Sequence, residues 1–280
     1  MRTFAHIVHP GVVDPSSDLI TAQPITFRTM EVARAFAEGV AHVTLYAVQY
    51  CDEERIPLPE SFVRVPDLTR SIADIKTFRE RRKLALIRHI LTRLQESAPD
   101  ADYLIYTNVD LGLQPYFYVT VDKFASQGYD AFVINRRTIT DQYTSVAEIP
   151  LMYAQAGEAH KGYDCFVFRS GYCPRFELGN VCIGTAWFGR AMLANMAACA
   201  TRFTEFREEH ATFHMGDSQV WREKRFDDYF AENRKEYQAI FEQIETERGK
   251  FAPDWRSYLL DTGKKRRFPD YESARFLADD

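Results

Sequence analysis

The chain has 280 residues, and 46% of them are hydrophobic, so it can bury a sizeable core as one large domain or two small ones. This composition excludes a chain that is mainly disordered. The formal net charge of −5 lacks the strongly basic character of proteins that grip a nucleic-acid backbone, so we expect no nucleic-acid partner.

Five cysteines are an odd number in a chain of this length, and no two of them form a CxxC pair. The sequence therefore suggests neither a disulfide framework nor a zinc site, and it fits reduced thiols in a cytoplasmic protein. The cysteines are Cys51, Cys165, Cys173, Cys182 and Cys199.

The first residues, MRTFAHIVHPGVV, show no signal-peptide pattern, and no run of eighteen or more apolar residues occurs in the chain. We therefore expect a soluble protein without a transmembrane segment. The basic run at residues 264–267, just before Phe268, has two interpretations: a solvated tail, or a peripheral contact with anionic lipid at the inner face of a membrane. The oligomeric state cannot be predicted from the sequence.

The first half of the chain alternates strand-like and helix-like segments, which is the pattern of a mostly parallel sheet covered by helices. We expect strands at residues 4–8 and 42–48 and a helix at residues 27–37. The next segment contains three prolines, at positions 57, 59 and 66, and is expected to be a loop because proline cannot donate to a sheet ladder.

Aliphatic residues at three- and four-residue steps then indicate a helix with one buried stripe, formed by Leu84, Ile87, Leu91 and Leu94. Four cations crowd its expected first turn, where they oppose the helix dipole. Such a placement is explained if some of them face phosphate, and exposure on a solvated turn is the alternative. The four cations are Arg79, Arg81, Arg82 and Lys83.

Later segments continue the alternation. A helix is expected between Pro115 and Gly128, and strands are expected at 130–134 and 164–168, separated by a long polar passage typical of a functional loop. An alanine-rich helix follows at 186–200. The chain continues with a short strand at 211–214 and a helix whose apolar stripe comprises Phe226, Phe230, Tyr237, Ile240, Phe241 and Ile244.

The stretch YLIYTNVDLGL, residues 103–113, is a hydrophobic strand that stops at Asn108 and Asp110. Strand residues two apart project from the same face, and ligand chemistry in open α/β sheets sits at the carboxyl ends of strands. We therefore consider both side chains as candidate ligand contacts. The alternative is a turn in which Asn and Asp bond to local backbone.

The order of a strand, a basic helix and then YLIYTNVD resembles the metal-dependent nucleotide-sugar glycosyltransferases of the A-type fold (GT-A), whose sheet ends in an acidic DxD motif. The resemblance spans residues 1 to about 222. It implies an α/β fold with a Rossmann-like, mixed, mostly parallel sheet flanked by helices. Residues 1–222 would then be the nucleotide-sugar-binding and catalytic domain, and residues 223–280 a helical C-terminal appendage.

The resemblance also implies a donor site. Asp110 matches the residue that holds a divalent cation, Mn²⁺ or Mg²⁺, under the donor diphosphate, where a hard cation neutralises the leaving group as a Lewis acid. Asn108 departs from the usual first acid of the motif, which leaves less negative charge for the metal. Arg82 and Lys83 are expected to approach the donor phosphates, and His9 and Pro10, where the first strand ends, to approach the nucleotide base.

A second stretch, ATFHMGDSQVW at residues 211–221, places His214 and Asp217 three residues apart around a glycine. An imidazole can ligate metal or contact phosphate. The resemblance implies that Asp217 is the base that deprotonates the acceptor hydroxyl and that His214 is a metal ligand or phosphate contact. Simple capping of a helix that begins at Asp217 is the alternative.

Asp164, at the start of the strand CFVF, precedes the segment LGNVCIG at residues 178–184, whose two glycines suit a wall against which a sugar lies. The resemblance implies that Asp164 binds donor-sugar hydroxyls or exchanges roles with Asp217. Turn chemistry explains an Asp at this position as well.

Other classes fit less well. Phosphatases of the haloacid dehalogenase type use the first Asp of DxD as a nucleophile, and the amide of Asn108 cannot act as one. No GxGxxG follows the first strand, which disfavours a dinucleotide-dependent oxidoreductase. We therefore expect an enzyme that transfers a sugar from a nucleoside-diphosphate sugar to a hydroxyl acceptor, with a non-catalytic sugar-nucleotide or partner-binding protein as the alternative.

Overall fold

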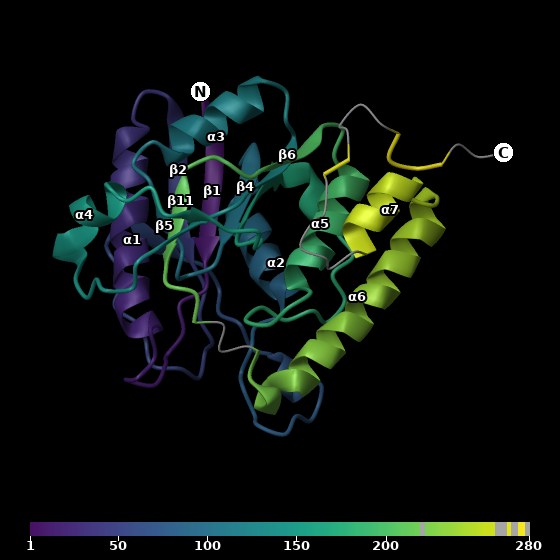
Figure 1. Cartoon of the computed structure of the whole chain (residues 1–280), viewed down its shortest axis with the longest axis horizontal. Coiled ribbons are helices and arrows are strands. Elements are labelled where there is room, and N and C mark those ends of the chain that lie inside the picture. The colour runs from purple at the N-terminus through teal and green to yellow at the C-terminus, as the bar shows by residue number, and fades with distance from the viewer. Residues whose placement is uncertain (219–221, 261–267, 270–273, 278–280) are drawn as a thin grey trace.

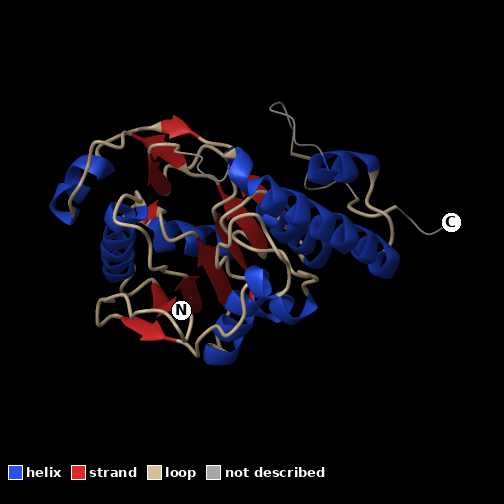
Figure 2. Ribbon diagram, turned by 90° about the horizontal axis from the view of Figure 1, so that it is seen from below, coloured by secondary structure: helices blue, strands red, loops and turns tan. Residues whose placement is uncertain are grey.

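The computed structural model describes residues 1–218, 222–260, 268–269 and 274–277. A central sheet lies between two layers of helices, and a smaller sheet adjoins it (Figures 1 and 2). The basic run at residues 264–267, and with it the predicted contact with lipid, lies outside the described residues.

The central sheet has seven strands in the order β10-β6-β9-β4-β1-β2-β3. Only β9 runs antiparallel to its neighbours, β4 and β6, and the other pairs are parallel. The predicted fold class, a mixed and mostly parallel sheet flanked by helices, is therefore confirmed. The strands are β1 (Arg2–Val8), β2 (Ala41–Ala47), β3 (Phe62–Arg64), β4 (Tyr103–Thr107), β6 (Ala131–Ile134), β9 (Cys165–Arg169) and β10 (Phe203–Phe206).

The smaller sheet has four short strands in the order β5-β11-β7-β8. The chain passes from the central sheet into it directly, because only Asn135 and Arg136 separate β6 from β7. Its strands are β5 (Gly112–Leu113), β7 (Arg137–Ile139), β8 (Glu158–Ala159) and β11 (Thr212–Met215).

The helices cover both faces of the central sheet. They are α1 (Leu19–Phe36), α2 (Ile87–Ser97), α3 (Phe117–Ser126), α4 (Ile149–Tyr153), α5 (Phe188–Cys199), α6 (Asp227–Arg248) and α7 (Pro253–Leu260). Alternate residues of the central strands face two different cores, as the pleat requires. Ala5 and Ile7 of β1 join one core, which also includes buried residues of α2, α5, α6 and α7, whereas Phe4 and Val8 join the other, with α1 and α3. Because both faces are covered, the strands are continuous hydrophobic runs.

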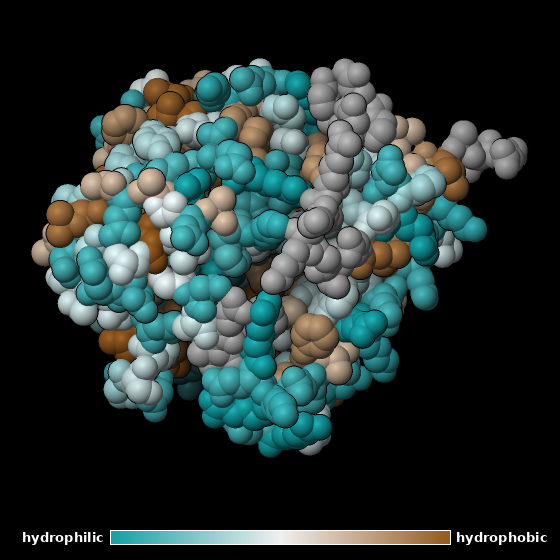
Figure 3. Space-filling view, in the orientation of Figure 1, coloured by the Kyte–Doolittle hydropathy of each residue, from teal (hydrophilic) through white to brown (hydrophobic). Residues whose placement is uncertain are grey.

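Short 3-10 helices fill several connections. They comprise Ile72–Asp74, Val146–Glu148, Ser170–Arg175 and Lys224–Phe226. Within the described part of the chain, no helix combines the length and the apolar character that crossing a bilayer requires. On the face shown in Figure 3, hydrophilic residues predominate and hydrophobic ones are scattered among them.

Several predicted boundaries are wrong. The first helix begins at Leu19 rather than at residue 27 and contains Pro24. The proline-rich loop contains β3, which pairs only with β2 at the edge of the sheet, where proline nearby is tolerated.

The predicted helix around Leu84 is wrong at its start, because α2 begins only at Ile87. Ala85 and Leu86 instead form bridges to Ser71 and Cys182, so this backbone is held in an extended form. Arg79, Arg81, Arg82 and Lys83 therefore precede the helix instead of forming its first turn, and their expected conflict with the helix dipole does not arise.

The order of the strands marks a position for a site. From β1 the chain continues to β2 and β3 on one side, whereas β4 lies on the other side of β1. In open α/β sheets, ligands bind outside the carboxyl ends of strands where the strand order reverses. This point is the carboxyl end of β1 and β4, where His9, Asn108 and Asp110 follow their strands.

Candidate functional site

Asn108 and Asp110 leave β4 in a tight turn. The N–H of Leu111 donates to the carbonyl oxygen of Asn108 at 3.3 Å, and the N–H of Asn108 donates to the carbonyl oxygen of Asp164 at 3.1 Å. The two predicted side chains then separate, since Asn108 contacts Asp164 and Asp110 contacts His214. The local turn that was the alternative interpretation is therefore present, and both side chains also contact residues from distant segments.

Asp110 and His214 form the first pair of the site. His214 Nε2 lies 3.2 Å from Asp110 Oδ2. The Nδ1–H of the same ring donates to the carbonyl oxygen of Gly216 at 2.8 Å, which fixes the ring and turns Nε2 toward Asp110.

Burial and charge act in opposite directions on this pair. Burial lowers the pKa of His214, but the hydrogen bond and charge of Asp110 outweigh it and raise that pKa above its ordinary value. Burial raises the pKa of Asp110, yet His214 and the charge of Arg136 lower it overall. Asp110 is therefore held as a carboxylate.

One carboxylate oxygen of Asp110 does not take part in the pair with His214. The side chain is 30% exposed, but its Oδ1 atom is buried and has no hydrogen-bond partner among the residues that the structure describes. A buried carboxylate oxygen without a partner is costly, so it indicates a place for a proton donor or a cation.

Arg136 connects two further carboxylates. Its Nη1 lies 2.6 Å from Asp164 Oδ2, and its Nη2 lies 3.2 Å from Asp217 Oδ1. His160 Nε2 lies 3.8 Å from the same oxygen of Asp217. His160 Nδ1 accepts from the N–H of Gly162 at 2.9 Å, so the proton of the neutral ring sits on Nε2 and points toward Asp217.

The pKa of His160 is lowered, first by burial and then by the charge of Arg136. A neutral His160 that presents an N–H to Asp217 can steady this carboxylate. It is not itself poised to accept a proton there.

His9 and Pro10 lie where β1 ends, as predicted. His9 Nδ1–H donates to the carbonyl oxygen of Val48 at 2.8 Å, and the His9 and Tyr50 rings form a T-shaped pair with centroids 5.5 Å apart. Burial is the main cause that lowers the pKa of His9. Pro10 is buried.

Arg82 and Lys83 do not share an environment. Lys83 Nζ forms an ion pair with Asp52, lies 3.7 Å from Glu53, and is 4.1 Å from the centroid of the Tyr50 ring. Because Tyr50 contacts His9, Lys83 lies near the ends of both β1 and β2. The Arg82 guanidinium instead lies 4.3 Å from the centroid of Phe226. Of this pair, only Lys83 contacts Tyr50 beside His9.

A divalent cation fits the donor set only in part. Within the described ranges, no three His, Cys, Asp or Glu side chains form a ready metal site. Asp110 and His214 offer two ligands, and the partnerless Oδ1 of Asp110 fits a cation. Mg²⁺ is commonly held by one or two carboxylates with substrate phosphates completing its shell.

The predicted residues form two linked sets. Asn108, Asp164 and Asp217 are joined through Arg136. The charge of Arg136 also acts on the pair Asp110 and His214, so all five lie in one site. Asp217 and Ser218 have no regular secondary structure, so the helix expected to begin at Asp217 does not begin there. Residues 219–221 lie outside the described residues.

Three contacts of the site were missed from the sequence. Arg136 follows β6 in the run INRRTI, which does carry a signal, namely a polar pair at a strand end. His160 lies in the long polar passage, where nothing marked it. Tyr106 appeared only as a hydrophobic strand residue, yet its hydroxyl donates to Asn108 Oδ1 at 3.2 Å.

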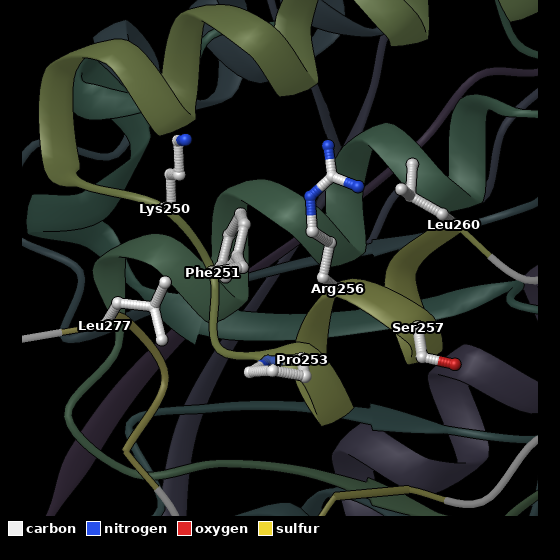
Figure 4. A pocket seen from close by; sticks show the side chains of 7 residues that line it. All are labelled: Lys250, Phe251, Pro253, Arg256, Ser257, Leu260 and Leu277. Atoms are coloured by element: carbon white, nitrogen blue, oxygen red, sulfur yellow. The ribbon is translucent and has the colours of Figure 1, made fainter.

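A cavity lies elsewhere in the described part of the molecule. It measures about 580 Å³ and is lined by residues from the connection between α6 and α7, from α7 itself and by Leu277 (Figure 4). None of the site residues discussed above lines it. Its lining residues are Lys250, Phe251, Pro253, Arg256, Ser257, Leu260 and Leu277.

No family model matches the sequence, and neither does any curated protein. Among solved structures, residues 1–349 of TarS from S. aureus in complex with UDP-GlcNAc are similar, with 10% identity, a TM-score of 0.48, and coverage of 88% of this chain and 71% of that chain. A longer TarS structure is covered over 41% of its length, with 7% identity and a TM-score of 0.42.

Two more structures are similar at a TM-score of 0.39. One is a proposed nucleotide-diphospho-sugar transferase from Desulfovibrio desulfuricans G20, with 12% identity and coverage of 86% of this chain and 99% of that chain. The other is a mutant Drosophila β1,4-galactosyltransferase 7 with manganese, UDP-Gal and xylobiose, with 11% identity and coverage of 78% and 72%. Because identity is low and each of these TM-scores is below 0.5, these similarities do not identify a function.

Proposed function

We propose that this protein is a glycosyltransferase that moves a sugar from a nucleoside-diphosphate sugar to a hydroxyl acceptor, with a divalent cation held at Asp110 and His214. The observation that carries the proposal is the buried, partnerless Oδ1 of Asp110 beside His214, at the carboxyl end of β4. It lies where the strand order reverses, which is where such sheets bind ligands.

Asp110 and His214 would supply the protein ligands. His214 Nδ1–H is committed to the carbonyl oxygen of Gly216, so Nε2 is the nitrogen that would bind a cation, in place of the proton that Nε2 shares with Asp110. Mn²⁺ or Mg²⁺ at this place supplies charge that neutralises the diphosphate as it leaves. Lys83, near His9 and Tyr50, would add positive charge on the nucleotide side.

Asp217 is the proposed base. Its side chain is 36% exposed, and Arg136 Nη2 and His160 Nε2 approach the same oxygen, which holds the carboxylate in one direction. In the transfer, Asp217 accepts the proton of the acceptor hydroxyl, the hydroxyl oxygen bonds to the anomeric carbon, and the bond to the nucleoside diphosphate breaks. A base in this role corresponds to inversion of the anomeric centre.

The test is to incubate the purified protein with a panel of sugar nucleotides and hydroxyl acceptors, in Mn²⁺, Mg²⁺ or chelator, and to measure free nucleoside diphosphate. We expect release with at least one donor in the presence of metal and none from Asp110→Ala. Asp122→Ala is a matched control, because Asp122 is a carboxylate paired with Arg2 and is not part of the site.

Two outcomes would count against the proposal. Full activity of Asp110→Ala would remove Asp110 from the mechanism. A rise in melting temperature with sugar nucleotide and Mn²⁺, but no release of nucleoside diphosphate with any donor and acceptor, would favour a binding protein over an enzyme.

A further inference from the structure

A continuous line of polar side chains joins the end of β4 to the loop after β11. The Tyr106 hydroxyl donates to Asn108 Oδ1 at 3.2 Å, and Asn108 Nδ2 donates to Asp164 Oδ1 at 3.0 Å. Arg136 Nη1 then donates to Asp164 Oδ2 at 2.6 Å, and Arg136 Nη2 to Asp217 Oδ1 at 3.2 Å. We call these five residues the polar row.

Exposure changes along the polar row. The side chains of Arg136 and Asp164 are only 10% and 11% exposed, whereas that of Asp217 is 36% exposed. Both oxygens of Asp164 are already engaged, one by Asn108 and one by Arg136. A ligand arriving from solvent therefore meets Asp217 before it meets Asp164.

The residue types in the polar row depend on one another. A carboxylate at position 108 would face that of Asp164 at about the 3.0 Å of the present hydrogen bond, and like charges that close cannot both ionise cheaply. The amide of Asn108 instead donates one hydrogen bond and accepts another. The geometry at position 136 requires arginine, because only a forked guanidinium can hold two carboxylates in fixed directions.

We infer that Asn108, Asp164 and Arg136 are positioning residues that fix the direction of the Asp217 carboxylate, and that Asp164 acts through Arg136 rather than on the substrate. This inference rests on the proposed function, in which Asp217 is the base. It also explains the amide at position 108. The Asn108 N–H needs an acceptor, and Asp164, next to the neighbouring strand β9, provides it.

The test is an exchange of the two side chains. In the double variant Asn108→Asp with Asp164→Asn, the new aspartate can accept from Tyr106, the new asparagine can donate to it and accept from Arg136, and the total charge is unchanged. Each single variant breaks the polar row: Asn108→Asp opposes two carboxylates, and Asp164→Asn turns its amide N–H₂ toward a second donor, either Asn108 Nδ2 or Arg136 Nη1.

Each single variant is expected to lower kcat about 100-fold, the scale of a misplaced catalytic group, with little change in KM for the donor. The double variant should regain most of the lost kcat and melting temperature. If the double variant regains its melting temperature but stays as inactive as Asp164→Asn, the carboxylate at 164 acts directly on substrate and the inference is overturned. Unchanged kcat in both single variants would overturn it as well.

A matched control is Gln243→Glu, which places a carboxylate against Glu247 on α6, outside the site. It can lower the melting temperature but should leave kcat unchanged. Arg136→Lys keeps the charge yet cannot hold both carboxylates, so it should lower kcat without raising KM for the donor.

Failure of the proposed function is recognised separately. If the wild-type protein releases no nucleoside diphosphate with any donor and acceptor, that function fails, and the polar row is judged on melting temperatures. A melting temperature of the double variant close to that of the wild type then supports the polar row as one unit. If its decrease in melting temperature equals or exceeds the sum of the two single decreases, the inference is overturned.

Discussion

Asp217 is the acid of the site that is most open to solvent, and its environment decides what it can do. Arg136 Nη2 and His160 Nε2 both approach its Oδ1 atom, at 3.2 and 3.8 Å. These contacts fix the direction of the carboxylate. A base held in this way can receive a proton from a hydroxyl without first rotating into place.

The variant Asp217→Asn tests this role. The amide keeps the size of the side chain and can still accept from Arg136, but it cannot take up a proton. Transfer should slow by roughly two orders of magnitude or more, the usual scale for a general base, while the rise in melting temperature caused by the donor stays. Unchanged transfer, measured as release of nucleoside diphosphate, would assign the base to another residue, with Asp164 the first to consider.

His6 is a second residue whose chemistry is set by its surroundings. It is completely buried in β1, between the Tyr118 hydroxyl at Nδ1 and the Thr107 hydroxyl at Nε2, each at 2.8 Å. A neutral imidazole can satisfy both contacts by donating one hydrogen bond and accepting the other. Burial lowers the pKa of His6 from 6.5 to about 3, so it is neutral in the folded protein.

This pKa predicts a loss of stability in mild acid. The unfolded chain takes up a proton at His6 below pH 6.5, whereas the folded chain does so only near pH 3. The free energy of unfolding should therefore fall, by up to about 1.4 kcal/mol per pH unit from this group, as the pH drops through that window. Urea unfolding of wild type and His6→Gln at about pH 7.5, 5.5 and 4.5 measures it, and parallel pH profiles would show that His6 does not contribute.

At the scale of elements, the pairing of β5 with β11 places His214. Gly112 in β5 lies opposite Phe213 in β11. A Cβ atom added at Gly112 would lie 2.4 Å from the Phe213 ring, so the absence of a side chain lets the two strands approach. Phe213 is buried and precedes His214, so the position of His214 depends on this contact.

The variant Gly112→Ala should therefore affect both stability and the site. Forcing a methyl group against a buried ring costs about 1–3 kcal/mol, and the displaced strand should weaken the response of the melting temperature to Mn²⁺ with sugar nucleotide. Adding Phe213→Leu makes room and should recover part of both effects. If Gly112→Ala melts and binds like wild type, the approach of these strands does not position His214.

The segment before α2 shows the limit of arguments from one element. Four cations before a helical stripe suggested a first turn with unfavourable charges, but residues 85 and 86 form bridges to other segments and delay the helix to Ile87. Helical periodicity in Leu84 to Leu94 could not reveal these partners, because they lie elsewhere in the chain.

At the scale of the whole molecule, the C-terminal helices share a core with the central sheet. Tyr237, Ile240 and Trp255 belong to the same buried cluster as Ala5 and Leu104. On the right in Figure 1, α6 and α7 lie beside α5, which is buried along nearly its whole length. The division into a domain at residues 1–222 and an appendage at 223–280 stays a prediction.

Trp255→Ala tests how closely these parts are linked. Trp255 is 1% exposed, and removing its side chain should cost about 3–5 kcal/mol. Because the cluster spans both parts, we expect calorimetry to show one unfolding transition, shifted to lower temperature in the variant. Two transitions, with only one of them shifted, would mean that α6 and α7 unfold as a separate unit.

The sequence by itself determined the layered α/β fold and the end of β4 as the place of interest. These features are local, because a strand buried on both faces must be a hydrophobic run, and the residues that end it are adjacent in the chain. The same argument located His9, Asn108 and Asp110 at strand ends, and it indicated His214 in a short strand and Asp164 and Asp217 next to strands.

Only the tertiary structure decided which of these residues meet. Arg136 is 28 residues from Asp164 and 81 from Asp217, and it contacts both because the chain passes there from the central sheet into the smaller one. The register of β11 on β7 and β5 then brings His214 to Asp110. Pairings of this kind depend on the packing of distant segments, which residue spacing along the chain does not record.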